Sequence, residues 1–357
     1  MILKRPAPLA RFLCLFGAVI VLGLPTDTQA GQQTSRRSSG TTSKKLSLKK
    51  TPASSKYSGT SARKRRASRA ATAARQLREV QEPRFKLDAS GALVPDVRAE
   101  AAIIYDSATG HVLWESNSNN QRSIASITKV MTAAVFIENS PDLSQTVVVD
   151  RADVRAASTT YLRAGYTVTK GDLLHLTLIA SDNAAARALA RVSPYGPVAF
   201  IDRMNEKAKE LGLTNTHYED PSGLLASNVS SAYDMAKLIT FVSADDRIAG
   251  VMRKQNYTVT SGRRVINIHS TNQLVMRGDV DVQAGKTGFI RNAGYCLATL
   301  LRLPQGPQIA VVVLGAKSNA GRFMETRHLF NWFSAKAQDL LGVAPVEAAE
   351  LKPAVNQ

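Results

Sequence analysis

Ser126 and Lys129 lie three residues apart in a stretch that has the apolar spacing of a buried helix. This spacing places the hydroxyl and the amine on one face of the helix, within reach of each other. A serine needs a base to become a nucleophile, and a lysine can be that base when burial and nearby cations lower its pKa. The positive N-terminal end of the helix also lies near Ser126. The pair therefore predicts nucleophilic catalysis.

Ser-x-x-Lys alone is a weak signal. The same spacing occurs at residues 47–50 and 61–64, in a stretch almost free of large apolar residues where no pocket can form. In the part of the chain that we expect to fold, it occurs only at Ser126. Two further groups of polar residues therefore bear on whether this pair is catalytic.

The first of these groups is Ser181-Asp182-Asn183, which lies between two apolar helical stretches and is therefore expected on a turn. Serine, aspartate and asparagine are also the preferred N-caps of helices. An ordinary helix cap is thus the alternative interpretation of this group.

The second group is Lys286-Thr287-Gly288, at the end of a predicted strand. The alternation of the strand puts Lys286 on the same side as Val282 and Ala284, and a lysine on an apolar side needs a reason. The alternative is an edge-strand lysine that prevents aggregation. Gly288 favours the functional interpretation, because a substrate backbone can lie close to a strand that has no side chain there.

Hydrophobic periodicity indicates which elements position these groups. Alternating apolar residues at 101–105 and 112–114 predict a hairpin, and from Ile124 the spacing becomes that of a buried helix. We also predict helices at 172–180, 184–191, 198–211 and 232–242, strands at 280–284, 295–301 and 309–314, and a closing helix at 322–340. This order predicts an α+β fold, with one antiparallel sheet flanked by helices and an inserted helical subdomain.

The N-terminal residues predict export. Three basic residues precede an apolar run at 12–24, and small or polar residues follow at 28–30. This pattern is typical of a cleaved secretory signal peptide, here residues 1–30. A retained membrane anchor is the alternative, although the run is short for a helix that spans a bilayer. We therefore expect the protein to be secreted across the cytoplasmic membrane, into the periplasm or cell envelope.

The net charge of +18 is concentrated in one segment. Residues 31–80 hold 14 lysines and arginines against one acid, which gives +13, while residues 1–30 carry +2 and the rest +3. This segment has too little apolar surface to offset the entropy of ordering. We expect a disordered basic tail at 31–95, one folded domain at 96–341 and a short tail at 342–357. Anionic envelope polymers or a membrane surface are the expected partners of the basic tail, rather than nucleic acid.

The order of the three groups, Ser126-Ile127-Thr128-Lys129, Ser181-Asp182-Asn183 and Lys286-Thr287-Gly288, resembles that of low-molecular-mass penicillin-binding proteins. The resemblance is to the serine D-alanyl-D-alanine carboxypeptidase and endopeptidase family, peptidase family S11, and covers about residues 97–341. It implies the penicillin-binding and β-lactamase-like transpeptidase fold, and it makes residues 96–341 a DD-peptidase catalytic domain.

Stretches outside the three groups carry the same resemblance, at residues 122–131, 211–213, 220–224 and 231–236. Asn272-Gln273-Leu274 resembles the endopeptidase branch in particular, as does the expectation that no C-terminal domain or membrane-binding helix is appended. We therefore expect cleavage within crosslinks as well as trimming of stem peptides. Ile290 departs from the pattern, because many relatives carry threonine there, and the resemblance does not fix the hydrogen bonding on that strand.

The resemblance implies an acyl-enzyme mechanism in cell-wall remodelling. Ser126 attacks the carbonyl of the penultimate D-alanine in a peptidoglycan stem peptide, Lys129 takes its proton, and water then hydrolyses the acyl-enzyme. Ser181 relays a proton to the leaving amine. The backbone N–H groups of Ser126 and Phe289 form the oxyanion hole. β-Lactams are expected to be covalent inhibitors at the same serine.

Substrate contacts are also implied by the resemblance. Asn183 binds the peptide backbone and helps to hold Lys129. Lys286 and Thr287 supply a positive charge and a hydroxyl to the terminal carboxylate, while Gly288 leaves room for the peptide.

No cofactor and no metal are expected. The histidines have none of the spacings that make a zinc site; they lie at positions 111, 175, 217, 269 and 328. Cys296 is the only cysteine after residue 30, so we expect no intramolecular disulfide even in an oxidising compartment.

Two other functions fit part of the pattern. A class A β-lactamase shares the three groups, but it needs a glutamate that activates a deacylating water, and the nearest candidate is Glu210 in residues 210–215. A non-catalytic envelope-binding protein, tethered by its basic tail, is the alternative from another class. The sequence leaves the preference between carboxypeptidase and endopeptidase, the crosslink type and the oligomeric state open.

Overall fold

The structure is a computed structural model that describes residues 66–68, 71–72, 74, 78, 81–304 and 306–341. The predicted signal peptide, most of the predicted basic tail and residues 342–357 lie outside the described residues. Within these described ranges, no helix is long and apolar enough to cross a membrane.

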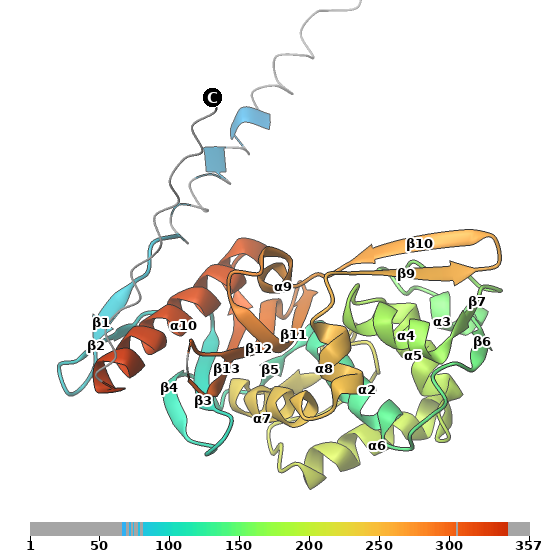
Figure 1. Cartoon of the computed structure of the whole chain (residues 1–357), viewed down its shortest axis with the longest axis horizontal. Helices are drawn as coiled ribbons and strands as arrows, with labels where there is room; N and C mark the ends of the chain where they lie inside the picture. The colour runs from blue at the N-terminus through green and yellow to red at the C-terminus, as the bar shows by residue number, and fades with distance from the viewer. Residues whose placement is uncertain are drawn as a thin grey trace, which may run out of the picture. The chain divides into compact units, whose positions relative to one another are not determined.

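A five-stranded antiparallel sheet lies on one side of the described domain, with the strand order β11-β12-β13-β3-β4 (Figure 1). Its strands are β3 (Ala101–Asp106), β4 (Val112–Ser116), β11 (Asp281–Ile290), β12 (Gly294–Arg302) and β13 (Gln308–Ala316). The predicted hairpin and the three later strands are therefore confirmed. β11 continues through Lys286-Thr287-Gly288, in agreement with the placement of this group at the end of a predicted strand, and it is an edge strand of this sheet.

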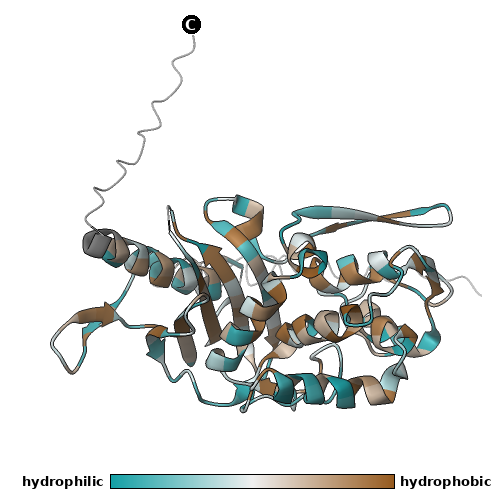
Figure 2. Ribbon diagram, turned by 60° about the horizontal axis from the view of Figure 1, so that its bottom comes forward, coloured by the Kyte–Doolittle hydropathy of each residue, from teal (hydrophilic) through white to brown (hydrophobic). Residues whose placement is uncertain are grey.

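The central strands β12 and β13 are buried on both faces, so each contributes alternate residues to two separate cores. Leu300 and Val312 belong to one core, whereas Leu301 and Val311 belong to the other. Helix α7 (Ala232–Ser243) covers the first face, and α10 (Asn319–Leu341) covers the second. Figure 2 shows the strands of the sheet coloured mostly as hydrophobic, and hydrophobic segments also occur on the helices. Burial on both faces explains why their sequences read as continuous apolar runs.

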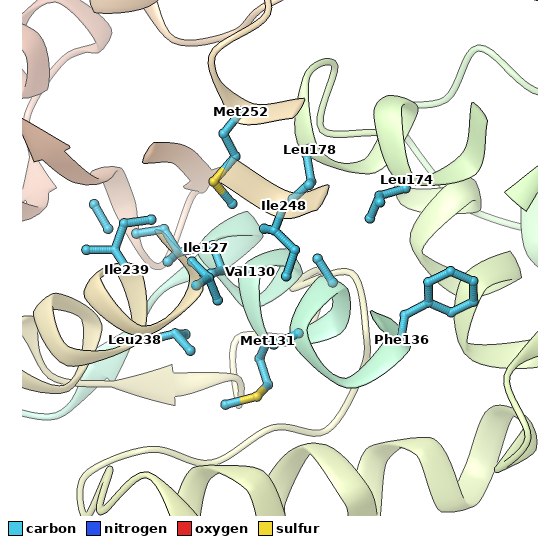
Figure 3. Packing of buried hydrophobic residues seen from close by; sticks show 14 of the residues in the cluster. Ile127, Val130, Met131, Phe136, Leu174, Leu178, Leu238, Ile239, Ile248 and Met252 are labelled. Carbon is cyan, nitrogen blue, oxygen red and sulfur yellow. The ribbon is translucent and has the colours of Figure 1, made fainter. Parts of the chain in front are cut away.

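Helix α2 (Thr128–Ile137) is the centre of the helical subdomain, and all ten of its residues are buried. It follows a 3-10 turn, η1 (Ala125–Ile127), rather than forming one continuous helix from Ile124. Around it lie α4 (Lys170–Leu178), α5 (Asn183–Val192), α6 (Gly196–Glu210) and α8 (Asp246–Met252). Figure 3 shows part of this cluster, including Ile127, Val130, Met131, Leu238, Ile239, Ile248 and Met252. A helix that is buried all round is a fixed platform for the side chains at its start.

Short elements complete the domain. They are α3 (Arg151–Val154), α9 (Gln273–Arg277) and the paired strands β5 (Arg122–Ser123) with β8 (Val229–Ser230), β6 (Thr146–Val148) with β7 (Thr167–Thr169), and β9 (Asn256–Ser261) with β10 (Arg264–His269). The β9–β10 hairpin was not predicted, because its two strands are largely exposed, with only Val259, Ser261 and Ile268 buried. It extends from the domain beside the helical subdomain (Figure 1).

One boundary needs correction. Strands β1 (Phe85–Leu87) and β2 (Leu93–Pro95) pair as a hairpin inside the segment 31–95 that was predicted to be disordered. The carboxylate of Asp88 accepts backbone hydrogen bonds from Ser90 and Ala92 and so fixes the turn. The hairpin is short, and its apolar residues Phe85, Leu87 and Leu93 are exposed, so no alternation between a buried and a solvent face marks it in the sequence.

Candidate active site

Ser126 lies in the 3-10 turn η1, directly before the buried helix α2. Ala125 has a φ of 50°, which is unusual for a residue with a side chain. Two glycines pack against this turn. A Cβ on Gly223 would lie 2.1 Å from the Ala125 carbonyl oxygen, and one on Gly288 would lie 2.5 Å from the Ile124 carbonyl oxygen. These close approaches require glycine at both positions, and they place the β11 backbone next to the serine.

Lys129 is fully buried, one turn along from the serine. Its Nζ lies 3.0 Å from Ser126 Oγ and 2.6 Å from Asn183 Oδ1, and it also donates to the Ser222 carbonyl oxygen. Burial lowers the pKa of Lys129 from 10.5 to about 7, although the charges of Asp220 and Asp182 oppose this shift. Near neutral pH the amine can therefore accept a proton from the serine hydroxyl.

In Ser181-Asp182-Asn183 the cap interpretation holds for the middle residue, while its two neighbours line the cleft. Asp182 is the N-cap of α5, where it accepts a hydrogen bond from Ala185 N at 2.9 Å. Ser181, with a φ of 60°, faces the pocket. The Asn183 amide is fixed by a donation to Ala157 O at 2.7 Å, so that its oxygen points at Lys129. The N-cap at Asp182 therefore fixes the positions of the neighbouring residues Ser181 and Asn183.

Lys286 is 1% exposed, so it is not a solvent-exposed edge lysine. Its Nζ donates to Ser181 Oγ at 2.8 Å and to Thr287 O at 2.9 Å. Burial, together with the charges of Lys129 and Arg322, lowers the pKa of Lys286 well below its usual value. A substrate carboxylate beside it would favour the charged ammonium form.

A cleft of about 460 Å³ brings the predicted residues together. Lys129 and Lys286 lie behind its wall, and its lining includes Ser126, Ser181, Asn183, Thr287, Gly288 and Phe289. A Cβ on Gly288 would lie 3.2 Å from the backbone N of Ser126, so the two predicted oxyanion donors come from adjacent backbone segments. The Phe289 side chain is half exposed and stacks on Tyr295, with ring centroids 4.2 Å apart.

The loop from Asp220 to Leu225 is a part of the site whose role the sequence analysis missed. Burial alone would raise the pKa of Asp220, but hydrogen bonds lower it below its usual value. Its carboxylate accepts from the backbone N of Gly223 and of Leu225, each at 2.8 Å. The loop thus presents the Ser222 carbonyl to Lys129. The family-like stretch 220–224 was a signal, but it did not show which atoms matter.

Arg322 on α10 is a second residue that was missed. Its Nη1 donates to Gly288 O at 2.9 Å and to Cys296 O at 3.1 Å, so it braces β11 and β12. Burial lowers the pKa of this guanidinium to about 10. Nothing in its local sequence marks it, since only the packing of α10 on the sheet brings it to the cleft.

Thr271 also lines the cleft, where its hydroxyl lies 2.6 Å from that of Thr287 on β11. Cys296 is buried and free. Among the described residues, no group of three or more His, Cys, Asp or Glu side chains is placed to hold a metal ion.

Glu210 does not meet the requirement of a class A β-lactamase. It lies at the end of α6, where it pairs with Arg203 at 2.5 Å and with Lys207 at 2.8 Å. No glutamate lines the cleft within the described part of the chain. The carboxylate of Glu210 is thus occupied by ion pairs on its own helix, so it gives no support to the β-lactamase alternative.

Curated relatives carry both names that the motifs suggested. The chain is 33% identical over 268 residues to a D-alanyl-D-alanine endopeptidase of Escherichia coli, covering 74% of this chain and 84% of the relative. It is 33% identical over 252 residues to D-alanyl-D-alanine carboxypeptidase DacC of the same organism, covering 67% of this chain and 62% of that relative.

Solved structures show the same fold. A mutant of the Streptomyces K15 DD-transpeptidase matches with a TM-score of 0.63 and 27% identity, covering 68% of this chain and all of that one. Penicillin-binding protein 5 of Haemophilus influenzae matches with a TM-score of 0.63 and 25% identity, covering 69% and 73%. The family model described as D-alanyl-D-alanine carboxypeptidase matches residues 88–318. The chain therefore belongs to peptidase family S11, the D-alanyl-D-alanine carboxypeptidase and endopeptidase family of serine DD-peptidases.

Proposed function

We propose that this protein hydrolyses D-alanyl bonds of peptidoglycan stem peptides through an acyl-enzyme at Ser126, in the periplasm or cell envelope. The observation that carries the proposal is the buried Lys129, whose amine contacts the serine hydroxyl at 3.0 Å and has a pKa of about 7. A buried lysine in this setting is a base poised near the working pH.

In the proposed reaction, the Ser126 hydroxyl loses its proton to Lys129 as its oxygen bonds to the carbonyl carbon. The backbone N–H groups of Ser126 and Phe289 stabilise the resulting oxyanion. The amide bond then breaks, and the leaving amine takes a proton through Ser181, which is hydrogen-bonded to Lys286. Water hydrolyses the ester and restores the serine.

We further propose that the enzyme cuts crosslinks as well as terminal D-alanyl-D-alanine. The support is the extent of similarity: matches to three endopeptidases span 84%, 78% and 88% of those relatives. Matches to the carboxypeptidases DacC, DacF and DacD span 62%, 57% and 63% of theirs. Asn272 adds to this, since it belongs to the stretch that resembles the endopeptidase branch and caps α9 beside the cleft.

The test is to incubate the purified enzyme with crosslinked muropeptide dimers and with monomeric pentapeptide, and to separate the products by chromatography. We expect dimers to be converted to monomers, and pentapeptide to lose D-alanine, with Ser126→Ala inactive on both. Dimers left intact while pentapeptide is trimmed would restrict the enzyme to carboxypeptidase activity.

A fluorescent penicillin distinguishes the enzyme from a non-catalytic envelope-binding protein. The wild-type chain should carry covalent label on a denaturing gel, and Ser126→Ala should carry none. Absence of label on the wild-type chain would favour the non-catalytic protein.

A further inference from the structure

A second hollow of about 370 Å³ lies next to the catalytic cleft, at the far end of β11. Phe289 and Arg291 line both hollows, so the aromatic side chain forms a shared wall. The Tyr295 ring stacks against that wall and lines only the second hollow. A ligand that extends along β11 from the serine would therefore pass from one hollow into the other.

Positive charge dominates the second hollow. Its charged side chains are Arg122, Arg291, Lys317 and a single acid, Glu100, which pairs with Lys317 and also attracts Arg122. Neither arginine forms an ion pair with any residue that the structure describes. The excess of cationic donors makes the hollow suitable for an anion.

The Arg122 guanidinium is packed closely and is only partly hydrogen-bonded. Its guanidinium packs against Gly315, where a Cβ would lie only 2.3 Å from Nη2. One Nη2 donation reaches Ala293 O at 3.4 Å, while Nε is buried and has no hydrogen-bond partner among the described residues. A buried donor without a partner is costly, and a ligand oxygen nearby would lower that cost.

The proposed reaction sets the direction of the substrate. Lys286 and Thr287 bind the terminal carboxylate, and the N–H of Phe289 binds the scissile carbonyl, so the peptide runs antiparallel to the free edge of β11. Residues upstream of the scissile bond then lie toward Arg291. Two residues of extended chain span about 7 Å, so they reach past Phe289 toward the turn that carries Arg291.

We propose that the hollow lined by Glu100, Arg122, Phe289, Arg291, Tyr295 and Lys317, which we name the upstream subsite, binds a carboxylate of the acyl-donor stem peptide. This carboxylate is carried about two residues upstream of the scissile D-alanyl bond. Arg291 is the specificity residue of the subsite, because it is exposed at the junction of the two hollows. The inference rests on the proposed function for the direction of the peptide.

The test compares two penicillins that share a stem-like side chain, ending in a carboxylate in one and in a carboxamide in the other. Second-order acylation rates are measured for the wild-type chain, for Arg291→Gln and for the matched control Arg263→Gln. Arg263 is an exposed arginine on the β9–β10 turn, outside both hollows. We expect the wild-type chain and the control to prefer the carboxylate about fivefold, and Arg291→Gln to lose that preference.

Three outcomes decide the inference. Loss of the preference in Arg291→Gln, with carboxamide acylation unchanged, supports the upstream subsite. Equal acylation of both penicillins by the wild-type chain, or an unaltered preference in Arg291→Gln, overturns it. Because acylation does not depend on muropeptide cleavage, uncleaved muropeptides would reject the proposed function while the acylation result still judges the subsite.

Discussion

Two opposing effects set the pKa of Lys129. Burial destabilises its ammonium form, whereas the carboxylates of Asp220 and Asp182 stabilise it, and the balance leaves a pKa of about 7. A lysine with its ordinary pKa would be almost fully protonated at neutral pH and would not act as a base. The side chain's three hydrogen-bond partners also fix its nitrogen beside the serine.

The first prediction at this scale concerns pH. Below a pH of about 7, Lys129 carries its proton and cannot accept one from Ser126, so acylation slows as the pH falls. We expect the second-order rate of acylation by a β-lactam to decrease about tenfold per pH unit well below 7 and to level off above it. Stopped-flow measurement between pH 5 and 9 provides the profile, and a rate independent of pH across this range would contradict the assignment.

A second prediction separates the base from a mere positive charge. Lys129→Arg keeps the charge but cannot release a proton near neutral pH, so its acylation should be nearly as slow as that of Lys129→Ala. Both rates are measured on variants whose folding is checked by circular dichroism. If arginine retained most of the rate, Lys129 would act through its charge alone.

At the scale of elements, the site is assembled from three segments with separate supports. The buried helix α2 carries Lys129, the edge strand β11 carries Lys286, and the loop after α6 presents the Ser222 carbonyl. The loop is fixed by its own hydrogen bonds, because the carboxylate of Asp220 accepts from the backbone N of Ser222, Gly223 and Leu225 and from Asn228 Nδ2. The catalytic geometry therefore depends on how the loop and the strand pack against η1.

Asp220→Asn tests this dependence. The amide group would face the donors Leu225 N and Asn228 Nδ2, which then lose an acceptor, so we expect acylation to slow by about tenfold. Because the charge of Asp220 raises the pKa of Lys129, its removal should also shift the pH profile of acylation to lower pH.

The matched control for this variant is Asp281→Asn, an exposed carboxylate at the start of β11 that pairs with Arg302. It should leave both the rate and the pH profile unchanged. A slower Asp220→Asn enzyme with an unshifted profile would mean that Asp220 supports the loop without acting on Lys129.

For the whole molecule, we expect the basic segment to attract anionic surfaces and the folded domain to carry out catalysis. Most of the excess positive charge lies in residues 31–80, while the catalytic groups all lie within residues 126–289. Attraction of such a segment to anionic polymers or lipid surfaces would be long-ranged and sensitive to salt.

Deleting residues 31–80 is the corresponding test. We expect kcat/KM for a soluble pentapeptide to stay within about twofold of the full chain, because the site contacts that the structure describes come from residues 126–322, while low-salt binding to anionic vesicles is lost. Cosedimentation and peptide hydrolysis are the two measurements. A large loss of hydrolysis would show that the segment belongs to the folded enzyme.

The sequence by itself determined which residues meet in the cleft and most of the elements that carry them. Ser126 and Lys129 are neighbours on one helical segment, so their contact depends on local geometry alone. The later strands β12 and β13 were predictable because burial on both faces produces continuous apolar runs. The hairpins β1–β2 and β9–β10 were not predicted. Most of their residues are exposed, so their sequences lack the apolar runs and alternation that burial produces.

Only the tertiary structure shows which residues from distant parts of the chain contact the serine and the strand β11. Arg322 reaches β11 because α10 packs on the sheet, and Gly223 contacts the serine turn because its loop folds back over α2. The value of the Lys129 pKa likewise depends on burial by surrounding helices and on carboxylates from distant segments. Such packing and electrostatic effects fall steeply with distance in space, and a linear sequence does not record that distance.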